Sequence, residues 1–588
     1  MPQLKQLTKY IKQTYQLARF ATDLPKLIPT AKVNPALLLQ QLAKKQPTAL
    51  ALAFENQRYT WRQMNARANQ YAAFFKKQGV RSGDVVALMM DNRPDYLFCV
   101  MGLNRIGAIT SLINTNLKGD ALEHALQACG STRLFLGTEH IPTFEDSPCA
   151  KNSDLKVWLH APAGQETSQD CVNKSIDGCS PRTTDYRYTP RGEDVYCYIY
   201  TSGTTGLPKA AVIRNQRMLG ANVFFGHLVH QSTPGSLIYV PLPLYHSNAM
   251  LLGFGSSLAT GAAIGLRQKF SASGFWPDVQ NFRATSFVYI GELCRYLLNT
   301  PSVPQERGHE LQVAVGNGLR PDIWEEFQER FEIPTIREFY GSTEGNAPAI
   351  NFSGKPGMIG RLAPSMVVVQ CDPTSGEIHR DARGHAKAVN AGESGLLLGK
   401  ISKLTTFEGY VDKKATAKKL EHDLFKSGDR YFNTGDLVKL HEGRWLSFED
   451  RLGDTFRWKG ENVSTTQVAE TLNGAQGVLE SNVYGVAVEK TEGKAGMVAL
   501  TTNDDFDIKK FAHFVKDELA AYQRPVFVRI IQGGMRVTGT FKHQKTDYRK
   551  EGFNPKLVQD PLYYLSAGNY LPVDAKAYKA IHQGEESI

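Results

Sequence analysis

Between residues 84 and 136 short apolar runs alternate with amphipathic stretches, and this alternation restricts the possible folds more than any other feature. The apolar runs have the length of buried strands, and the stretches between them have helical periodicity. In chain order these segments are 84–90, 96–106, 108–113, 118–128 and 133–136. Alternating strands and helices predict an α/β fold of layered helices and largely parallel sheets.

The chain changes character after about Asp450. The sequence predicts a hairpin at 456–462, with Gly460 near its tip. A capping box at Ser464–Gln467 then predicts a helix through Leu472. Further strand and helix signals follow at 481–488, 497–501, 508–522 and 526–531. We therefore expect three parts: an N-terminal helical segment (1–50), a large domain (51–450) and a small mobile α+β domain (451–588). Residues 138–192 are polar and rich in turns, which favours mostly loop with an irregular edge.

Composition excludes some classes of function. The net charge of +10 over 588 residues fits anionic ligands such as nucleotides, or an anionic membrane surface. No Lys/Arg block dominates a segment, so nucleic acid is a weaker interpretation. The eight cysteines include no CxxC pair, which argues against a zinc or redox motif. Cys99, Cys197 and Cys294 lie in apolar runs and are expected to be buried free thiols, consistent with a reducing, cytosolic compartment.

Two segments raise the question of membrane contact. Near the N-terminus, where no signal peptide is visible, Leu4, Leu7, Tyr10, Ile11 and Leu17 recur at helical spacing between lysines. This pattern is typical of a helix packed on the globule, and alternatively of a membrane-surface helix. Residues 249–266 are uncharged but rich in Gly, Ala and Ser, which favours a buried segment of a soluble domain over a transmembrane span.

The segment Tyr198–Lys209 has the composition of a polyanion-binding loop. An apolar run ends at Tyr200, and Ser, Thr and Gly residues follow before Pro208 and Lys209. Glycines let backbone N–H groups turn inward, hydroxyls add donors, and the lysine adds a point charge. We expect this loop to lie between a strand (194–200) and a helix (about 214–229), whose N-terminus would favour phosphate. The Walker A spacing is absent.

Four further clusters accompany this loop: Gly316–Asp322, Glu338–Gly345, Tyr431–Asp436 and Phe448–Asn462. Each taken alone would be an ordinary turn or loop. In this order they resemble the adenylate-forming superfamily of acyl-CoA synthetases, luciferases and peptide-synthetase adenylation domains, over roughly residues 50–550. The segments Tyr289–Leu298, Thr538–Lys545, Gly552–Pro555 and Asp560–Tyr564 resemble the branch of fatty acid transport proteins and very-long-chain acyl-CoA synthetases.

The resemblance implies a two-step reaction and assigns the ATP site. A carboxylate attacks the α-phosphorus of ATP, and the thiol of coenzyme A then displaces AMP, so catalysis rests on positioning and charge stabilisation. Glu344 would bind Mg²⁺, Asp436 and Arg451 would contact the ribose, and Lys542 would serve as the adenylation lysine, with Lys545 an open alternative. The residues implied for ATP or AMP are Thr201, Ser202, Gly203, Thr204, Thr205, Gly206, Lys209, Gly316, Asn317, Gly318, Tyr340, Gly341, Thr343, Asp436 and Arg451.

The resemblance also implies a second site and a hinge. His246 and Asn248 would lie near the acyl and coenzyme A pocket, although a histidine capping a strand end is an equal interpretation of His246. Trp458, Lys459 and Gly460 would approach this pocket when the C-terminal domain rotates about Gly453, because glycine absorbs large backbone changes. The uncharged stretch 250–264 would line an acyl tunnel.

The sequence therefore predicts an ATP-dependent fatty acid–CoA ligase for long or very long chains, cytoplasmic or peripheral on the inner membrane surface. Two alternatives remain. One is a membrane-associated fatty acid transport protein without catalysis. The other is a fatty acyl-AMP ligase that delivers to a carrier protein; the short connection between Asp436 and Arg451 lacks the insertion of such relatives, and no carrier domain is visible in the sequence.

Overall fold

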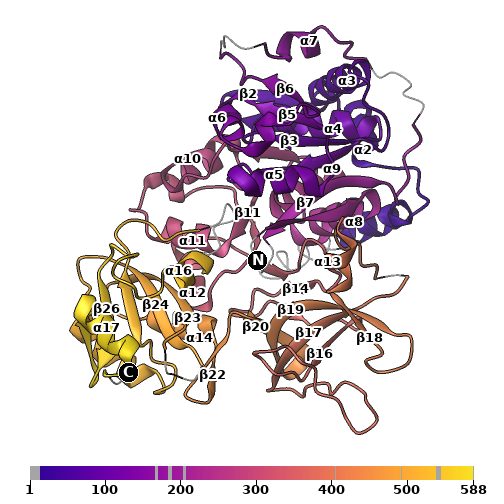
Figure 1. Ribbon diagram of the computed structural model, residues 1–588. Helices are drawn as coiled ribbons and strands as arrows, with labels where there is room; N and C mark the ends of the chain where they lie inside the picture. Colours follow the sequence, from indigo (N-terminus) through magenta and orange to yellow (C-terminus); the bar gives the residue numbers. More distant parts are fainter. Residues whose placement is uncertain are drawn as a thin grey trace.

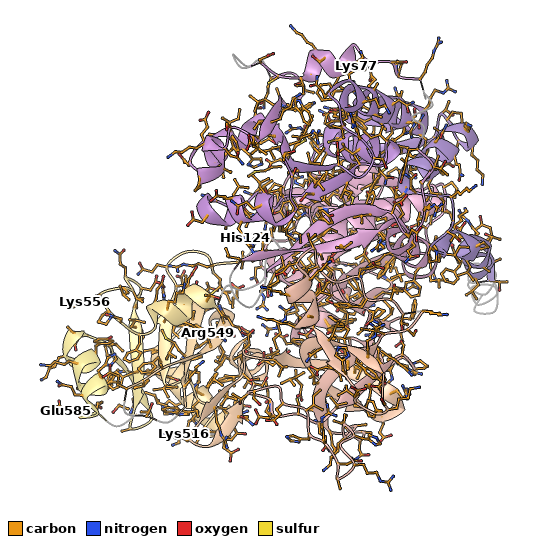
Figure 2. The ribbon with its side chains drawn as sticks, turned by 45° about the vertical axis from the view of Figure 1, so that its right-hand side comes forward. Lys77, His124, Lys516, Arg549, Lys556 and Glu585 are labelled. Carbon is orange, nitrogen blue, oxygen red and sulfur yellow. The ribbon has the colours of Figure 1, made fainter. Side chains whose placement is uncertain are left out.

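The computed structural model describes residues 14–165, 170–182, 188–202, 207–403, 405–489, 491, 493–537 and 545–586. Figure 1 shows two bodies, with the first three quarters of the chain in one and the C-terminal end, in orange and yellow, in the other. We call residues 14–451 the large unit and residues 456–586 the C-terminal unit. Figure 2 shows Arg549 on the side of the C-terminal unit that faces the large unit, whereas Lys556 and Glu585 lie on its opposite side.

Two sheets with parallel centres form the core of the large unit, as the alternation of strands and helices predicts. The first has the order β6-β5-β3-β4-β7-β8, and only β8 is antiparallel to its neighbour. Its strands are β3 (Val85–Met89), β4 (Ile109–Leu112), β5 (Arg133–Gly137), β6 (Lys156–His160), β7 (Val195–Ser202) and β8 (Pro208–Arg214).

The second sheet has the order β14-β13-β12-β11-β9-β10-β1-β2, with antiparallel strands at both edges. Its strands are β1 (Leu50–Phe54), β2 (Gln57–Thr60), β9 (Leu237–Val240), β10 (Ala263–Leu266), β11 (Ser286–Ile290), β12 (Val313–Asn317), β13 (Ile336–Tyr340) and β14 (Ala349–Asn351). Polar residues follow β12 and β13 at their carboxyl ends, where parallel strands bring their connections together at one edge of the sheet.

A third, antiparallel sheet completes the large unit, and a fourth forms the C-terminal unit. The third contains β15 (Gly360–Arg361), β16 (Met366–Val369), β17 (Ser394–Lys400), β18 (Leu420–His422), β19 (Arg430–His441) and β20 (Trp445–Arg451). The fourth contains β23 (Val478–Val486), β24 (Ala495–Thr502), β25 (Phe527–Ile530), β26 (Leu562–Ser566) and β27 (Asn569–Pro572), and the hairpin β21 (Phe456–Trp458) and β22 (Glu461–Val463) precedes it.

Helices cover these sheets, and some of them begin at a residue whose side chain accepts from a first-turn N–H group. Thr60 and Gln63 form a capping box at the start of α3, and Ser464 accepts from the N–H of Gln467 at the start of α14. The longer helices of the large unit are α2 (Pro35–Lys45), α3 (Trp61–Lys77), α4 (Pro94–Arg105), α5 (Gly119–Ala128), α8 (Asn215–Val223), α10 (Ala272–Phe282), α11 (Gly291–Leu298) and α12 (Pro321–Arg330). Those of the C-terminal unit are α14 (Thr465–Leu472), α15 (Ile508–Glu518), α16 (Thr546–Glu551) and α17 (Ala575–Gln583).

Shorter helices fill the connections. They are the 3-10 helices η1 (Leu24–Leu27), η2 (Thr138–His140), η3 (Pro148–Lys151), η6 (Pro304–Glu306) and η7 (Glu442–Arg444), the π-helices η4 (Phe224–Val229) and η5 (Asn248–Gly255), and the α-helices α6 (Ile141–Glu145), α7 (Asn173–Asp177), α9 (Ser256–Thr260) and α13 (Lys413–Ala417). The uncharged stretch 249–266 is thus a π-helix, a short α-helix and a buried strand. Within the described residues, no helix has the length and apolarity needed to cross a membrane.

Most described residues of 138–192 lie outside α-helices and strands, as expected, and β6 forms an edge of the first sheet there. One sequence-based expectation about the elements is wrong, because the expected helix does not follow the polyanion-like loop directly. Thr201 pairs with Lys209 in an antiparallel β7–β8 arrangement, and α8 begins only at Asn215. The loop therefore joins two strands, and no helix N-terminus follows it directly. The prediction that Cys99, Cys197 and Cys294 are buried is confirmed.

Candidate active site

Asp436 lies at the centre of one group of predicted site residues. Asp436 lies on β19 and pairs directly with Arg451 on the neighbouring strand β20. The hydroxyl of Tyr340, at the end of β13, donates to Oδ2 of Asp436 at 2.5 Å, and Nε of Arg451 lies 3.3 Å from Oδ1. Asp436 is buried, whereas Arg451 is largely exposed. Three motifs that are distant in sequence therefore meet at one carboxylate.

A second group surrounds Glu344. This buried carboxylate accepts a hydrogen bond of 2.8 Å from the hydroxyl of Tyr410. Burial and the charge of Glu344 raise the pKa of Tyr410, so its hydroxyl stays protonated as a donor. Nζ of Lys209, from β8, lies 5.9 Å from the centre of the Tyr410 ring. Tyr410 thus connects the lysine of the polyanion-like loop with the predicted metal-binding carboxylate.

Arg217 of α8 holds the backbone of the loop that carries Thr343 and Glu344. Its guanidinium donates to the carbonyl oxygens of Ser342 (3.2 Å), Glu344 (3.2 Å) and Gly345 (2.7 Å). The side-chain hydroxyl of Ser342 is buried and has no hydrogen-bond partner among the described residues. The loop is therefore fixed through its backbone, independently of its side chains.

The predicted acyl and coenzyme A residues lie beside the predicted nucleotide residues. Nδ2 of Asn248 donates to Oδ1 of Asn317, the last residue of β12, at 2.7 Å. The hydroxyls of Ser247 and Thr343 lie 3.4 Å apart. The ring of His246, in the same segment, packs at 4.4 Å from that of Tyr245. The structure thus brings the 246–248 segment to the edge of the site.

Lys419 is a further cation at this site. Its Nζ donates to the carbonyl oxygen of Thr434 at 3.1 Å, two residues before Asp436. Burial lowers the pKa of Lys419, the charges of Glu344 and Asp436 oppose this effect, and those of Arg451 and Lys209 add to it. Lys419 therefore lies within electrostatic reach of both groups of residues.

The hairpin of Trp458, Lys459 and Gly460 lies elsewhere. Trp458 is buried in the core of the C-terminal unit, and Nζ of Lys459 lies 5.5 Å from the centre of its ring. Trp458 pairs with Glu461 across the hairpin, and the buried residues of its core all belong to the C-terminal unit. The structure therefore does not bring these two sets of residues together in this arrangement of the units.

Some predicted residues lie outside the described residues, namely Gly203, Thr204, Thr205, Gly206 and Lys542. The alternative adenylation lysine, Lys545, is described. Its Nζ donates to Oγ1 of Thr465 at 2.6 Å and lies 3.6 Å from Oδ2 of Asp454. These contacts lie within the C-terminal unit and at the connection to it.

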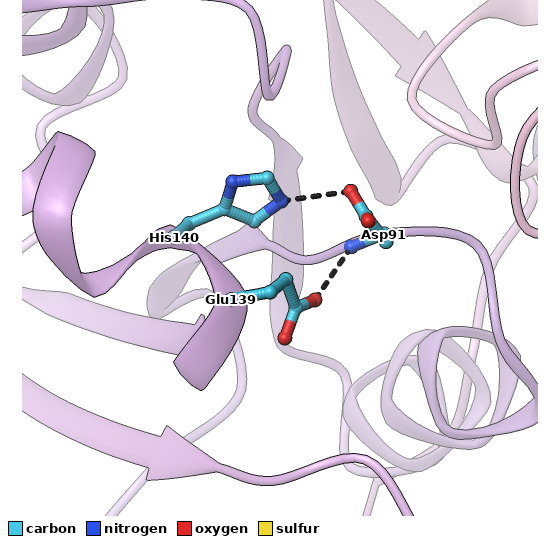
Figure 3. A group of neighbouring side chains, drawn as sticks. All are labelled: Asp91, Glu139 and His140. Carbon is cyan, nitrogen blue, oxygen red and sulfur yellow. Dashed lines mark hydrogen bonds and ion pairs between the residues drawn. The ribbon is translucent and has the colours of Figure 1, made fainter.

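Asp91, Glu139 and His140 form a separate cluster at the carboxyl ends of β3 and β5 (Figure 3). Their ligand-type atoms lie within 4.8 Å of one another, close enough to suggest a divalent cation. However, Nε2 of His140 contacts Asp91 at 2.8 Å, and the guanidinium of Arg93 contacts Glu139 at 2.5 Å. Because each carboxylate already has a basic partner, we interpret the cluster as an ion-pair network that joins two strand ends.

Sequence motifs did not indicate Tyr410, Arg217 or Lys419. Each is a single residue outside the quoted clusters, and its role depends on tertiary contacts. Together with the predicted residues, they give two buried carboxylates and at least three cations around one region. Carboxylates accept hydrogen bonds from hydroxyl groups and bind magnesium, and the positive charges of lysine and arginine neutralise phosphates. This donor set fits a nucleoside triphosphate with a divalent metal.

The comparisons with known proteins agree with this class of site. Residues 39–410 match the family described as AMP-binding enzyme, and the chain belongs to this family. It is 40% identical over 598 residues to long-chain fatty acid transport protein 2 of Rattus norvegicus, covering 99% of this chain and 95% of that protein. It is 37% identical over 560 residues to the medium/long-chain-fatty-acid–CoA ligase FadD6 of Mycobacterium tuberculosis, covering 95% and 92%.

A solved structure supports the fold. The anthranilate CoA ligase AuaEII in complex with anthranoyl-AMP has a TM-score of 0.75 at 20% identity, over 90% of this chain and 98% of that one. The adenylate-forming fold and the family expected from the motifs are therefore confirmed. The relatives also bear the names of the branch that Tyr289–Leu298 and the C-terminal segments indicate.

Proposed function

We propose that the chain is an ATP-dependent fatty acid–CoA ligase for long or very long chains, which forms acyl-CoA through an acyl-adenylate and releases pyrophosphate and AMP. The observation that carries this proposal is the convergence of Glu344 and Asp436, both buried, on a region within reach of Lys209, Lys419 and Arg451. The names of the relatives, a fatty acid transport protein and a fatty acid–CoA ligase, support the choice of acid.

In the first step, the chain's residues position ATP and balance its charge. Asp436 and Arg451 hold the ribose, the loop ending at Lys209 holds the β- and γ-phosphates, and the turn Gly316–Gly318 frames the adenine. Tyr340 orients Asp436 through its hydroxyl. Lys542 neutralises the charge that develops between the carboxylate and the α-phosphate. Lys545 is the weaker candidate for this role, because it is already paired with Thr465 and Asp454.

Glu344 is the residue that would hold Mg²⁺, with Thr343 beside it to bind a phosphate oxygen. The ion, when bound, withdraws charge from the leaving pyrophosphate. Tyr410 supports the metal-binding role of Glu344. Its hydroxyl donates to one carboxylate oxygen of Glu344 and so fixes the rotamer of that side chain.

In the second step, coenzyme A would enter near His246 and Asn248, and the C-terminal unit would change its orientation. The backbone supports a pivot at Gly453. The N–H of Leu452 donates to the carbonyl of Gly435 in the large unit (2.9 Å), whereas Asp454 is bound by Arg549 of the C-terminal unit (3.0 Å). The pivot thus falls between residues 452 and 454, close to the boundary at 450/451 that the composition predicts.

The deciding experiment follows the two steps separately. Purified protein should release pyrophosphate from ATP only with a fatty acid, and should form a thioester only when coenzyme A is added. A series of acids from medium to very long chains defines the preference. Lys542→Ala should lower pyrophosphate release about 100-fold, whereas Lys550→Ala, an exchange of a nearby lysine, should not. Absence of acid-dependent pyrophosphate release across the series would contradict the proposal.

The same assay addresses both alternatives. A transport protein without catalysis would bind fatty acid but release no pyrophosphate. A fatty acyl-AMP ligase would release pyrophosphate but give no thioester with coenzyme A. Accumulation of acyl-adenylate in the presence of coenzyme A would therefore favour the carrier-dependent enzyme.

We also place the chain in the cytoplasm, peripherally bound to the inner membrane surface through its N-terminal segment. Tyr15, Leu17, Leu24 and Ile28 are between 46% and 58% exposed, an unusual set of apolar side chains so close in sequence. The double substitution Leu24→Asp and Ile28→Asp should reduce cosedimentation with anionic vesicles. Leu571→Asp, which changes an exposed leucine of the C-terminal unit, should leave cosedimentation unchanged.

A further inference from the structure

Glu338 is the first residue of the cluster Glu338–Gly345, and no step above uses its buried carboxyl group. It lies on β13, two residues before Tyr340, and only 3% of its surface is exposed. Its backbone pairs with Gly316 of β12 on one side and with Asn351 of β14 on the other. Among the described residues, no lysine, arginine or histidine forms an ion pair with it. A buried acid without a basic partner is costly to keep, so its contacts call for an explanation.

Three donors converge on this carboxyl group. The N–H of Gly318 donates to Oε2 at 2.9 Å, the N–H of Leu319 donates to Oε1 at 2.8 Å, and the hydroxyl of Tyr289 donates to Oε1 at 2.8 Å. Two of these donors are backbone groups of the turn that follows β12. Glu338 therefore holds this turn by its main chain, independently of the turn's side chains.

The turn itself needs such an anchor. Gly318 has φ +80°, a left-handed conformation that most residues avoid. The carbonyl of Gly318 also packs so close to α11 that a Cβ at Gly291 would overlap it. Asn317, the last residue of β12 and the neighbour of Gly318, accepts the hydrogen bond from Asn248. Displacement of the turn would thus move both the proposed adenine contacts and Asn248.

We infer that Glu338 is a positioning residue for nucleotide binding: it fixes the Gly316–Gly318 turn against which the adenine packs, and does so best as a carboxylate. This inference rests on the proposed function. The carboxylate accepts all three donors, whereas the protonated group gives up an acceptor position and must itself find an acceptor. Adenine binding should therefore strengthen as Glu338 loses its proton.

The surroundings place that change in an accessible pH range. Burial raises the pKa of Glu338 to about 8, although the hydrogen bonds from Leu319, Tyr289 and Gly318 lower it. The titratable groups that face it are Tyr289 from β11 and Cys294 from α11, and burial raises the pKa of both well above their usual values. Asn351 on β14 does not titrate. Glu338 is thus the group near the turn that changes charge around pH 8.

The test measures binding of adenosine by calorimetry, because adenosine carries no group that titrates from about pH 6.5 to about pH 9. In the wild type, affinity should rise about three- to tenfold across this range, the effect of one hydrogen bond. Glu338→Gln, which cannot ionise, should bind about three- to tenfold more weakly at pH 9 and show no pH dependence. In turnover it should raise the KM for ATP and leave the KM for the fatty acid unchanged.

Glu306→Gln is the matched control. Glu306 is a buried glutamate with three polar partners, Ser302, the N–H of Val303 and Arg330, and it lies on η6 away from the turn. Its exchange should lower stability but leave adenosine affinity and its pH profile as in the wild type.

Equal adenosine affinity of wild type and Glu338→Gln would overturn the inference, as would the same loss of affinity in Glu306→Gln. If Glu338→Gln does not fold, a flat wild-type profile overturns it. Failure of the wild type to bind adenosine or ATP would instead reject the proposed function.

Discussion

Lys419 illustrates how much of the site depends on a single side chain. Its Nζ donates to the carbonyl of Thr434, and it lies among the charges of Glu344, Asp436, Arg451 and Lys209. We expect Lys419→Met to raise the KM for ATP about tenfold, because a charge-assisted contact to a phosphate is lost. The thermal unfolding midpoint should change little, since the hydrogen bond to Thr434 is the one contact to a backbone group. Steady-state kinetics with varied ATP measures this effect.

Lys418 provides the control for this prediction, because it is the exposed neighbour of Lys419. Lys418→Met removes the same charge from the chain and should leave the KM for ATP unchanged. Lys419→Arg should restore part of the affinity. An equal effect of the two methionine substitutions would mean that only the net charge of the chain matters, and the prediction would be wrong.

At the level of residues, the sequence predicts those that belong to recognisable clusters. Tyr340 and Glu344 come from one cluster, and Asp436 and Arg451 from two others, and the structure joins Tyr340, Asp436 and Arg451 directly. Single residues such as Tyr410 could not be predicted in this way. A tyrosine before a short helix carries no local sign that it will meet a carboxylate 66 positions away. Such contacts arise from strand pairing across the fold.

Among the elements, the strands and helices with clear periodicity were predicted well, and β8 was not. Residues 208–214 begin with proline and lysine and contain two alanines, which are poor strand formers, so the run lacks a strong strand signal. Its pairing with β7 decides its conformation. The phosphate-binding role assigned to this segment therefore relies on the loop and Lys209, without a helix dipole.

The start of α14 connects this helix to the end of β20. The carboxylate of Asp450 accepts from the N–H of Thr465 at 2.6 Å and from its hydroxyl at 2.9 Å. Asp450→Ala removes these acceptors and should cost about 1 kcal/mol, as the loss of a hydrogen bond does. Because the contact crosses from the large unit to the C-terminal unit, the substitution should also change the ratio of the adenylation and thioester-forming rates.

The matched variant is Asp507→Ala, which removes the cap of α15. Asp507 accepts from the N–H groups of Lys509 and Lys510 and lies entirely within the C-terminal unit. It should lower the unfolding midpoint without altering the ratio of the two rates. Measurement of both half-reactions in single-turnover experiments separates the variants. If Asp450→Ala and Asp507→Ala both leave the ratio of the two rates unchanged, Asp450 contributes only to stability.

At the scale of the whole molecule, the sequence predicts a small C-terminal domain beside a large one, but not how these two face each other. That arrangement depends on contacts such as the hydrogen bond from Arg295 of α11 to the carbonyl of Leu479, at 3.1 Å. Arginine on an amphipathic helix is common on any surface, so nothing local identifies it as an interface residue. The proposed pivot at Gly453, by contrast, is what the family resemblance implies, and the composition change near Asp450 lies close to it.

The pH dependence of stability should contain a contribution from Glu338. Burial raises its pKa from an ordinary value of 4.5 to about 8, so between these values the folded chain holds a proton that the unfolded chain has released. Stability then falls as pH rises, by at most about 1.4 kcal/mol per pH unit, and the effect ends above about pH 8. As the pH rises toward about 8, the thermal unfolding midpoint of Glu338→Gln should therefore increase relative to that of the wild type.

Glu306→Gln again serves as the control for stability. The pKa of Glu306 is lowered: burial opposes this shift, but Ser302 and Arg330 outweigh it. Its contribution to stability is therefore complete above its usual pKa and constant from about pH 5 to about pH 8. The midpoint difference for Glu306→Gln should not vary across this range. A constant difference for Glu338→Gln as well would show that Glu338 is ionised throughout.

The proposed rotation of the C-terminal unit can be tested at Gly453. This glycine has φ +85°, and no atom lies within 4 Å of the place where a Cβ would stand. Gly453→Ala therefore fits sterically but strains the described orientation by about 1 to 2 kcal/mol, which shifts the population of the two orientations. One half-reaction should slow about tenfold relative to the other.

Gly443→Ala offers a control, because Gly443 has φ +69° in the β19–β20 connection of the large unit. It should lower the unfolding midpoint and slow both half-reactions equally or not at all. If Gly453→Ala also leaves the ratio unchanged, the units do not rotate about this residue.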